Sequence, residues 1–132
     1  MRVKVVSIIF YFVLFITGIL ILFINSKIQQ TVIPQPGEYY YSNFLRNNYS
    51  YISGSLLFLT GLISGYYFKS NPWVTGISLI AIFPIIAIYE ATIYRGSHNL
   101  IPLELAVHFL FALPAVIGAY LGRYIKKMKP SN

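Results

Sequence analysis

The stretch Val5–Ile24, VVSIIFYFVLFITGILILFI, decides the class of fold, because it runs for twenty residues without a charged side chain. Apart from one serine, one tyrosine, one threonine and one glycine, every residue in it is Val, Ile, Leu or Phe. A helix of this length crosses the hydrocarbon core of a bilayer, which is about 30 Å thick. The run is longer than the roughly 7–15-residue apolar core of a cleavable signal peptide, and no small-residue cleavage site follows it. The sequence therefore predicts a retained transmembrane helix at residues 5–24.

The composition of the whole chain also indicates a protein that lies in lipid. Of its 132 residues, 57% are hydrophobic and 10% are charged, against roughly 25% charged residues in soluble domains. The chain has no cysteine, which excludes disulfides, thiolate metal sites and cysteine nucleophiles. The net charge is +7, and the basic residues flank apolar runs, so we expect them to meet anionic lipid headgroups rather than nucleic acid. The length suits a single membrane domain over residues 1–132.

Three further apolar runs predict helices at residues 50–68, 73–94 and 101–124. Asn71 and Pro72 suit the N-cap and first position of the middle run, and Pro102 opens the last run in the same way. The alternating pattern of transmembrane barrel strands is absent. We therefore predict an all-α polytopic membrane protein with four transmembrane helices in an up-down-up-down bundle.

Basic residues predict how this bundle is oriented, because cytoplasmic segments carry an excess of Lys and Arg. One side of the predicted bundle receives seven of them: Arg2, Lys4, Lys69, Arg123, Lys126, Lys127 and Lys129. The other side receives Lys27, Arg46 and Arg95. We therefore expect both termini in the cytoplasm (N-in/C-in) and a multi-pass protein of the cytoplasmic (inner or plasma) membrane.

One sizeable external loop is predicted at residues 25–48. It contains PQPGEYYYSNFL, in which two prolines and a glycine interrupt regular structure. A short turn at headgroup depth would place four apolar and aromatic side chains on one side: Tyr40, Tyr41, Phe44 and Leu45. The segment is either a loop that lies on the membrane or a flap that binds a partner or ligand.

Small residues predict where the helices touch, because helices in lipid associate through close approach of their backbones. We expect two stripes to pack against neighbouring helices, in this chain or in another: Gly54, Gly61 and Gly65 in residues 50–68, and Ala115, Gly118 and Gly122 in residues 101–124. Pro84 and Pro114 each remove one backbone hydrogen bond, so a kink is expected near each. The carbonyls of Ile80 and Leu110 would then lack their usual donors.

The few ionisable residues gather in one predicted hairpin. Residues 89–109, YEATIYRGSHNLIPLELAVHF, hold two of the three acidic residues and both histidines. The short turn in this stretch makes its two helices antiparallel neighbours. Glu90 and Glu104 should therefore lie at similar depth near the outer surface, with Arg95 and His98 in the turn above them.

His108 shares a helix face with Glu104 and with the small residues of the last run, because side chains four apart lie on one face. This face should point into the bundle, since a charged group facing lipid costs about 2.5–3.5 kcal/mol at mid-membrane. The structural interpretation is that Glu104 caps its helix, Glu90 pairs with Arg95 or His98, and His108 bonds to Glu104 or to a freed carbonyl. The functional interpretations are a metal site of the two acids and two histidines, or a proton or cation relay.

No catalytic motif is present, and Ser97 beside His98 has no evident third member of a triad. We therefore expect a protein that is not an enzyme and needs no cofactor. The first hypothesis is a helix-packing subunit or partner of a membrane complex, with the lipid bilayer, a further copy or another membrane protein as partner. The alternative is a small oligomeric cation- or proton-linked channel or transporter, whose outward vestibule is formed by Glu90, Glu104 and His108.

Overall fold

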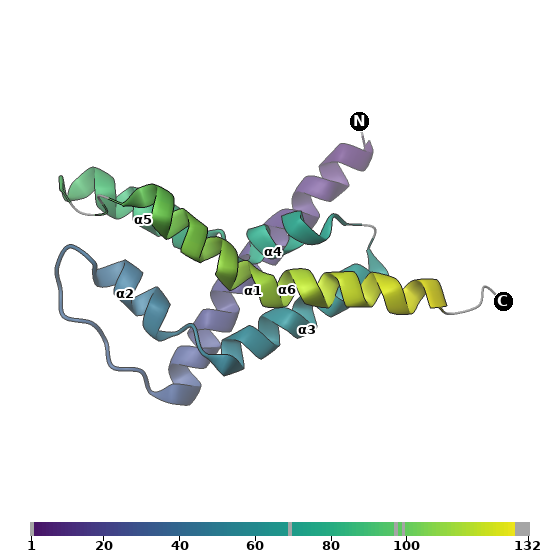
Figure 1. The fold of residues 1–132 in the computed structure, drawn as a ribbon, viewed down its shortest axis with the longest axis horizontal. Helices are drawn as coiled ribbons and strands as arrows, with labels where there is room; N and C mark the ends of the chain where they lie inside the picture. The colour runs from purple at the N-terminus through teal and green to yellow at the C-terminus, as the bar shows by residue number, and fades with distance from the viewer. Residues whose placement is uncertain (1, 69, 97, 99, 129–132) are drawn as a thin grey trace.

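The computed structural model describes residues 2–68, 70–96, 98 and 100–128, which form six helices and no strand. The helices are α1 (Arg2–Gln29), α2 (Tyr40–Asn47), α3 (Tyr51–Tyr67), α4 (Pro72–Ile80), α5 (Ile82–Ile93) and α6 (Ile101–Met128) (Figure 1). The all-α prediction is therefore confirmed for this part of the chain. Lys69, Ser97 and Lys129, which entered the predictions above, lie outside the described residues.

Two helices are long and apolar enough to cross a membrane alone, the Ser7–Gln29 part of α1 and the whole of α6. Together α4 and α5 meet the same requirement, and they add a third candidate if the 46° bend between them is a break within one span. The structure thus supports membrane association, with two candidate spans or up to three.

The pair α3 and α6 forms the most extensive contact, and the two helices lie side by side (Figure 1). A Cβ atom added at Gly61 would overlap the backbone carbonyl of Ala115. Three more glycines meet the backbone of the opposite helix in the same way: Gly65, Gly118 and Gly122. Nothing lies within 4 Å of a Cβ added at Gly54, which takes no part in this contact. Five of the six small residues predicted for packing therefore lie in one interface within the chain.

A break at Ala81 separates α4 from α5, where the sequence predicts one helix. Pro84 accounts for the position of the break, because it has no N–H for the Ile80 carbonyl and its ring crowds that carbonyl. The Ala81 N–H bonds back only three residues, to the Ser78 carbonyl at 3.4 Å, which tightens the end of α4. In contrast, α6 continues through Pro114 without interruption.

The first helix packs against α4 and leaves much of its own surface uncovered. Their contact is closest at Gly18, where an added Cβ would overlap the Leu79 carbonyl. The start of α1 projects away from the other helices (Figure 1), and the side chains of Ile8 and Phe12 are 68% and 61% exposed. From Ser7 onwards, the buried hydrophobic side chains of α1 are Leu14, Ile21 and Leu22.

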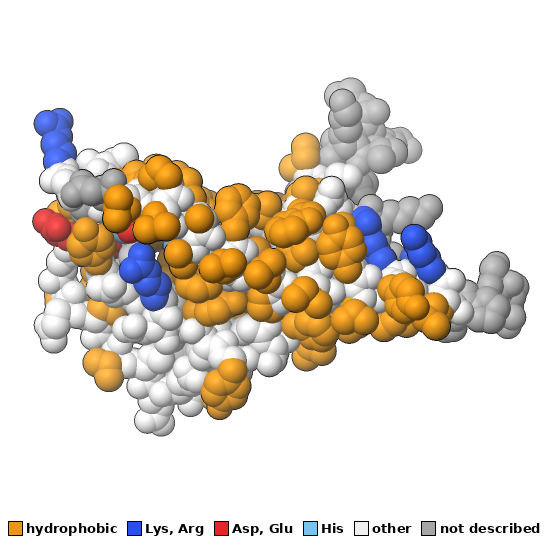
Figure 2. Space-filling view, in the orientation of Figure 1, with side chains coloured by type: hydrophobic (Ala, Val, Ile, Leu, Met, Phe, Trp, Pro, Cys, Tyr) orange, Lys and Arg blue, Asp and Glu red, His pale blue; other side chains and the backbone are white. Residues whose placement is uncertain are grey.

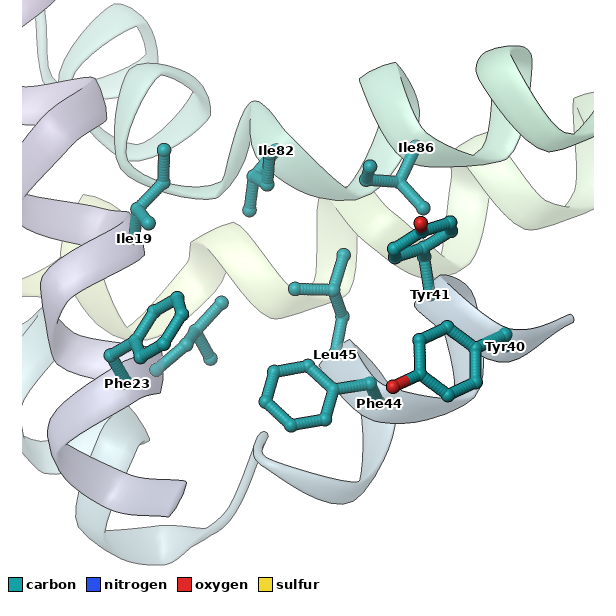
Figure 3. Close-up of a pocket in the computed structure, with 9 residues that line it drawn as sticks. Ile19, Phe23, Tyr40, Tyr41, Phe44, Leu45, Ile82 and Ile86 are labelled. Carbon is teal, nitrogen blue, oxygen red and sulfur yellow. The ribbon is translucent and has the colours of Figure 1, made fainter. Parts of the chain in front are cut away.

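The predicted external segment, residues 25–48, contains a helix, α2, where the sequence predicts only a turn. Its Ser42 and Leu45 side chains are buried, and it contacts α5. An apolar groove of about 290 Å³ lies where α2 meets α1 and α5 (Figure 3). Its labelled lining residues are Ile19 and Phe23 from α1, Tyr40, Tyr41, Phe44 and Leu45 from α2, and Ile82 and Ile86 from α5. The aromatic residues predicted to share one side of a turn therefore share one side of a helix.

Two buried asparagines fix the ends of the segment that carries α2. Asn25 Nδ2 donates to the Asn48 carbonyl at 2.7 Å, and Thr31 Oγ1 donates to Asn48 Oδ1 at 2.7 Å. The hydroxyl of Ser50, the N-cap of α3, donates to Asn25 Oδ1 at 3.1 Å. These bonds tie the end of α1 to the junction between α2 and α3, so α2 is held close to the bundle.

Candidate functional site

Glu90 lies on α5 under α2, and only 1% of its surface is exposed. Its Oε1 accepts hydrogen bonds from the backbone N–H groups of Tyr41 at 2.8 Å and Ser42 at 3.3 Å. Its Oε2 accepts from the Ser42 hydroxyl and faces His98 Nε2 at 3.0 Å. These two N–H groups belong to the first turn of α2, where no helical carbonyl is available to accept from them. The carboxylate therefore caps α2 from a distant part of the chain and fastens it to α5.

His98 lies between two carboxylates in the turn that joins α5 to α6. Its Nε2 faces Glu90, and its Nδ1 faces Glu104 Oε2 at 2.6 Å. Two ring nitrogens that both face carboxylates both make hydrogen bonds only if the ring is an imidazolium or one acid is protonated. His98 has a φ of 54°, and its backbone N–H donates to the Tyr39 hydroxyl at 3.2 Å. The turn thus directs the ring inwards, where its side chain is fully buried.

Arg46 of α2 completes this group of charges. Its Nη2 lies 3.7 Å from Glu104 Oε1, and its side chain is 43% exposed, against 19% for that of Glu104. We call Glu90, His98, Glu104 and Arg46 the outer cluster. When His98 is an imidazolium, the outer cluster has two positive and two negative charges, so the charge of the buried Glu90 is compensated.

His108 lies about one turn further along α6, and it is buried with its Nδ1 atom lacking a hydrogen-bond partner among the described residues. Its ring packs at centroid distances of 5.5 Å from Phe83 and 6.1 Å from Phe111. The expected hydrogen bond between His108 and Glu104 is not formed. A buried nitrogen without a partner costs about 1–3 kcal/mol, and Nδ1 of His108 is the one buried side-chain nitrogen or oxygen without a partner among the described residues.

Tyr49 supports the same region from the junction between α2 and α3. Its ring stacks on Phe111 at a centroid distance of 4.2 Å, and its hydroxyl donates to the Phe111 carbonyl at 2.9 Å. This carbonyl is next to that of Leu110, which loses its usual donor because Pro114 has no N–H. Burial raises the pKa of the Tyr49 hydroxyl above its ordinary value, so the hydroxyl remains a donor at neutral pH.

The structure brings together three of the five ionisable residues predicted for a site. Glu90, Glu104 and His98 are in direct contact. His108 is nearby without a hydrogen bond to them, and Arg95 is exposed on the turn. Of the two partners predicted for Glu90, His98 is the one that the structure shows.

Sequence reasoning missed the contribution of the external segment. Ser42 bonds to Glu90, which lies 48 residues further along the chain, and Arg46 pairs with Glu104, which lies 58 residues further along. The available signal was the apolar spacing of Tyr41, Phe44 and Leu45, which suits one face of a helix. No sequence signal indicated which acid that helix would meet.

The outer cluster does not have the geometry of a metal site. The two nitrogens of His98 point to different carboxylates, so no single point lies close to all three groups. Among residues 2–68, 70–96, 98 and 100–128, no group of three or more His, Asp or Glu side chains is arranged to hold a metal ion. The contacts within the cluster are hydrogen bonds and ion pairs.

No protein-family model, curated protein or solved structure matches this chain. We therefore infer its function from the geometry of its own residues. That geometry consists of a hydrogen-bonded cluster around the buried Glu90 and His98 that fastens α2, a histidine nearby whose Nδ1 has no partner among the described residues, and a large uncovered apolar surface on α1.

Proposed function

We propose that the chain is a non-enzymatic integral membrane protein of the cytoplasmic membrane that acts as a helix-packing subunit or partner of a larger membrane complex. In this proposal α1, α3, the bent pair α4–α5 and α6 are four spans with both termini in the cytoplasm. A fourth span at α3 is consistent with its 17 residues, at the short end of the roughly 17–25 that cross a bilayer.

The positions of the helix ends and of the charged side chains support this membrane-spanning arrangement. The start of α1, the end of α6 and the connection from α3 to α4 lie towards one end of the molecule, with α2 and the α5–α6 turn at the other (Figure 1). On the visible face, charged side chains gather at the two ends and apolar side chains cover the length between them (Figure 2). A protein that crosses a bilayer needs this pattern, since charge is costly in the hydrocarbon core.

The observation that carries the proposal is the uncovered apolar surface of α1. Within an 18-residue apolar stretch of each helix, 22% of α1 is buried inside the structure, compared with 39% of α6. From Ser7 onwards, the exposed apolar side chains on the projecting half of α1 are Ile8, Ile9, Phe12, Val13 and Ile16. Lipid alone can cover such a surface, but a helix that extends beyond its own bundle also offers a face to helices of another protein.

A photoreactive benzoylphenylalanine at position 12 tests this role in intact membranes. We expect irradiation to give a protein adduct of defined mass, because a helix of the complex lies within reach. Position 59 provides the matched control, since Leu59 is 51% exposed on α3 and should give lipid adducts. Only lipid adducts at both positions would contradict the role as a packing subunit.

A second candidate, a small proton- or cation-linked channel or transporter, is favoured by the hydrogen-bonded series from Glu104 through His98 to Glu90. This series connects a partly exposed carboxylate with a buried one, and both of its hydrogen bonds form when the imidazole or one of the acids carries an additional proton. The test is pH-dependent cation flux in liposomes that contain the purified protein. Flux that is lost in Glu104→Gln would support transport. No flux between pH 5 and 8 would favour the packing role, in which Glu104→Gln and His108→Ala weaken folding or assembly only.

A further inference from the structure

A pocket of about 380 Å³ lies beside the outer cluster, between α2 and the first turns of α6. Its polar lining consists of Arg46, Glu104 and His108, and its apolar lining includes Leu103, Val107 and Phe111. We call it the headgroup pocket. It differs from the apolar groove of Figure 3 because a guanidinium, a carboxylate and an imidazole are among the groups that line it.

The polar groups of the headgroup pocket have unused hydrogen-bonding capacity. The guanidinium of Arg46 lies 3.7 Å from Glu104 Oε1, which is too far for a hydrogen bond. His108 is 5% exposed, and its Nδ1 has no partner in the described part of the chain. Arg46 and Glu104 can therefore each bind a further polar atom, and His108 lines the same pocket with a nitrogen that lacks a partner.

The apolar part of the pocket continues onto a surface that faces outwards. Leu103 and Val107 line the pocket and are 60% and 40% exposed. A molecule that fills the pocket therefore needs a polar end with charges of both signs and an apolar end that lies along α6. A glycerophospholipid with a zwitterionic headgroup has this form.

We propose that the headgroup pocket binds an ethanolamine phospholipid of the outer leaflet. The phosphate accepts hydrogen bonds from Arg46, whose planar group suits phosphate oxygens. The primary ammonium donates to Glu104, and the imidazole of His108 bonds to the phosphate or the glycerol ester. The proposal rests on the membrane-spanning arrangement proposed above.

Native mass spectrometry of the protein released from nanodiscs tests whether it retains ethanolamine phospholipid in preference to choline phospholipid. The nanodiscs contain equal amounts of ethanolamine and choline phospholipids with the same acyl chains. Both lipids carry a phosphate and a positive charge, but the three methyl groups of choline remove the donors that Glu104 needs. We expect about tenfold more retained ethanolamine lipid, as one hydrogen bond to a charged group implies. Equal retention of the two lipids would overturn the proposal.

Substitutions test whether the preference for ethanolamine phospholipid arises in the headgroup pocket. Arg46→Gln should lower the retention of both lipids, whereas Arg95→Gln should not, because Arg95 is an exposed arginine near the same end and does not line the pocket. Glu104→Gln should abolish the preference between the lipids. Since Glu104 also holds His98, His108→Phe serves as the second variant, and it should reduce retention without disturbing that contact. Unchanged retention in both Arg46→Gln and His108→Phe would contradict the assignment.

Soluble glycerophosphoethanolamine distinguishes a lipid from a free phosphoester. We expect millimolar amounts to leave the retained lipid in place, because the soluble compound lacks acyl chains to lie along α6. Displacement would show that the pocket takes a water-soluble phosphoester, which would overturn the lipid assignment. Failure of this proposal is distinguishable from failure of the proposed function, because crosslinking at position 12 does not depend on the headgroup pocket.

Discussion

At the scale of single residues, Glu90 explains how the short helix α2 can be held in place. The eight residues of α2 are too few for a stable helix in isolation. The Glu90 carboxylate supplies an acceptor for the first N–H groups of α2, and its second oxygen lies 3.0 Å from Nε2 of His98. The contact with His98 was predictable from the short turn between their helices. The contact with Ser42 was not, because it depends on how the external segment folds back.

Replacing Glu90 with alanine should release α2. The change leaves the N–H groups of Tyr41 and Ser42 without their acceptor and His98 without one of its two carboxylates. We expect the free energy of unfolding to fall by roughly 3–5 kcal/mol, as for other broken buried ion pairs. Denaturant titration in mixed micelles measures it, and faster proteolysis within residues 30–50 reports the release of α2.

The control for this variant is Glu38→Ala. Glu38 is the third acid of the chain, and it is exposed. Its replacement should change the free energy of unfolding by less than about 0.5 kcal/mol. Similar losses in the two variants would mean that Glu90 does not fasten α2.

Tyr49→Phe removes one donor and keeps the ring that stacks on Phe111. At neutral pH we expect a loss of about 1 kcal/mol of unfolding free energy, the usual value for one hydrogen bond. Burial raises the pKa of the Tyr49 hydroxyl above its ordinary 10.0, so the folded protein favours the protonated form. The stability that this group contributes is therefore complete below about pH 10 and is lost as the pH rises through the raised value. Unfolding titrations of both proteins from pH 8 to 12 should show the difference between them shrinking only above pH 10, and a constant difference would contradict this account.

At the scale of helices, the sequence predicts contacts better than boundaries. The small-residue stripes identify the two faces of α3 and α6 that meet, because only small side chains allow this backbone approach. Gly54 fits the same stripe on a helical wheel, but it lies near the start of α3, where α6 does not reach it. Similarly, Pro84 predicts a bend in the third run, whereas the break itself lies three residues earlier at Ala81. The sequence pattern gives the face of a helix, and the crossing of the partner helix decides how far along that face the contact extends.

A pair of glycine substitutions tests the contact between α3 and α6. Gly118→Ala places a Cβ on the backbone of Phe58, which cannot move without separating the helices. We expect a loss of about 1–3 kcal/mol in the free energy of unfolding, the usual cost of overpacking. Gly54→Ala adds the same atom in open space and should be neutral or stabilising by up to about 1 kcal/mol, since alanine favours helix. Denaturant titration in micelles compares the two, and equal effects would show that small residues do not set this interface.

At the scale of the whole molecule, charged side chains lie towards two opposite ends, and α1 is less covered by its neighbours than α6 is. The basic end carries Arg123, Lys126 and Lys127 of α6, and the outer cluster lies at the opposite end. The sequence predicted this division, because Lys and Arg flank the apolar runs. It did not predict that α1 would project from the bundle, because a helix that is apolar all round does not show which side packs.

The absence of cysteine from the chain makes this arrangement directly testable with single-cysteine variants. We expect a membrane-impermeant maleimide to label Glu38→Cys in intact cells and Lys127→Cys only after the membrane is opened, since the proposed orientation places the two positions on opposite sides of the membrane. Leu59→Cys, in the middle of α3, should stay unlabelled in both cases, because the reactive thiolate forms in water and not in hydrocarbon. Labelling of position 59 without denaturation would remove α3 from the set of spans. Equal labelling of positions 38 and 127 in intact cells would place both ends of the molecule on one side of the membrane and would contradict the proposed orientation.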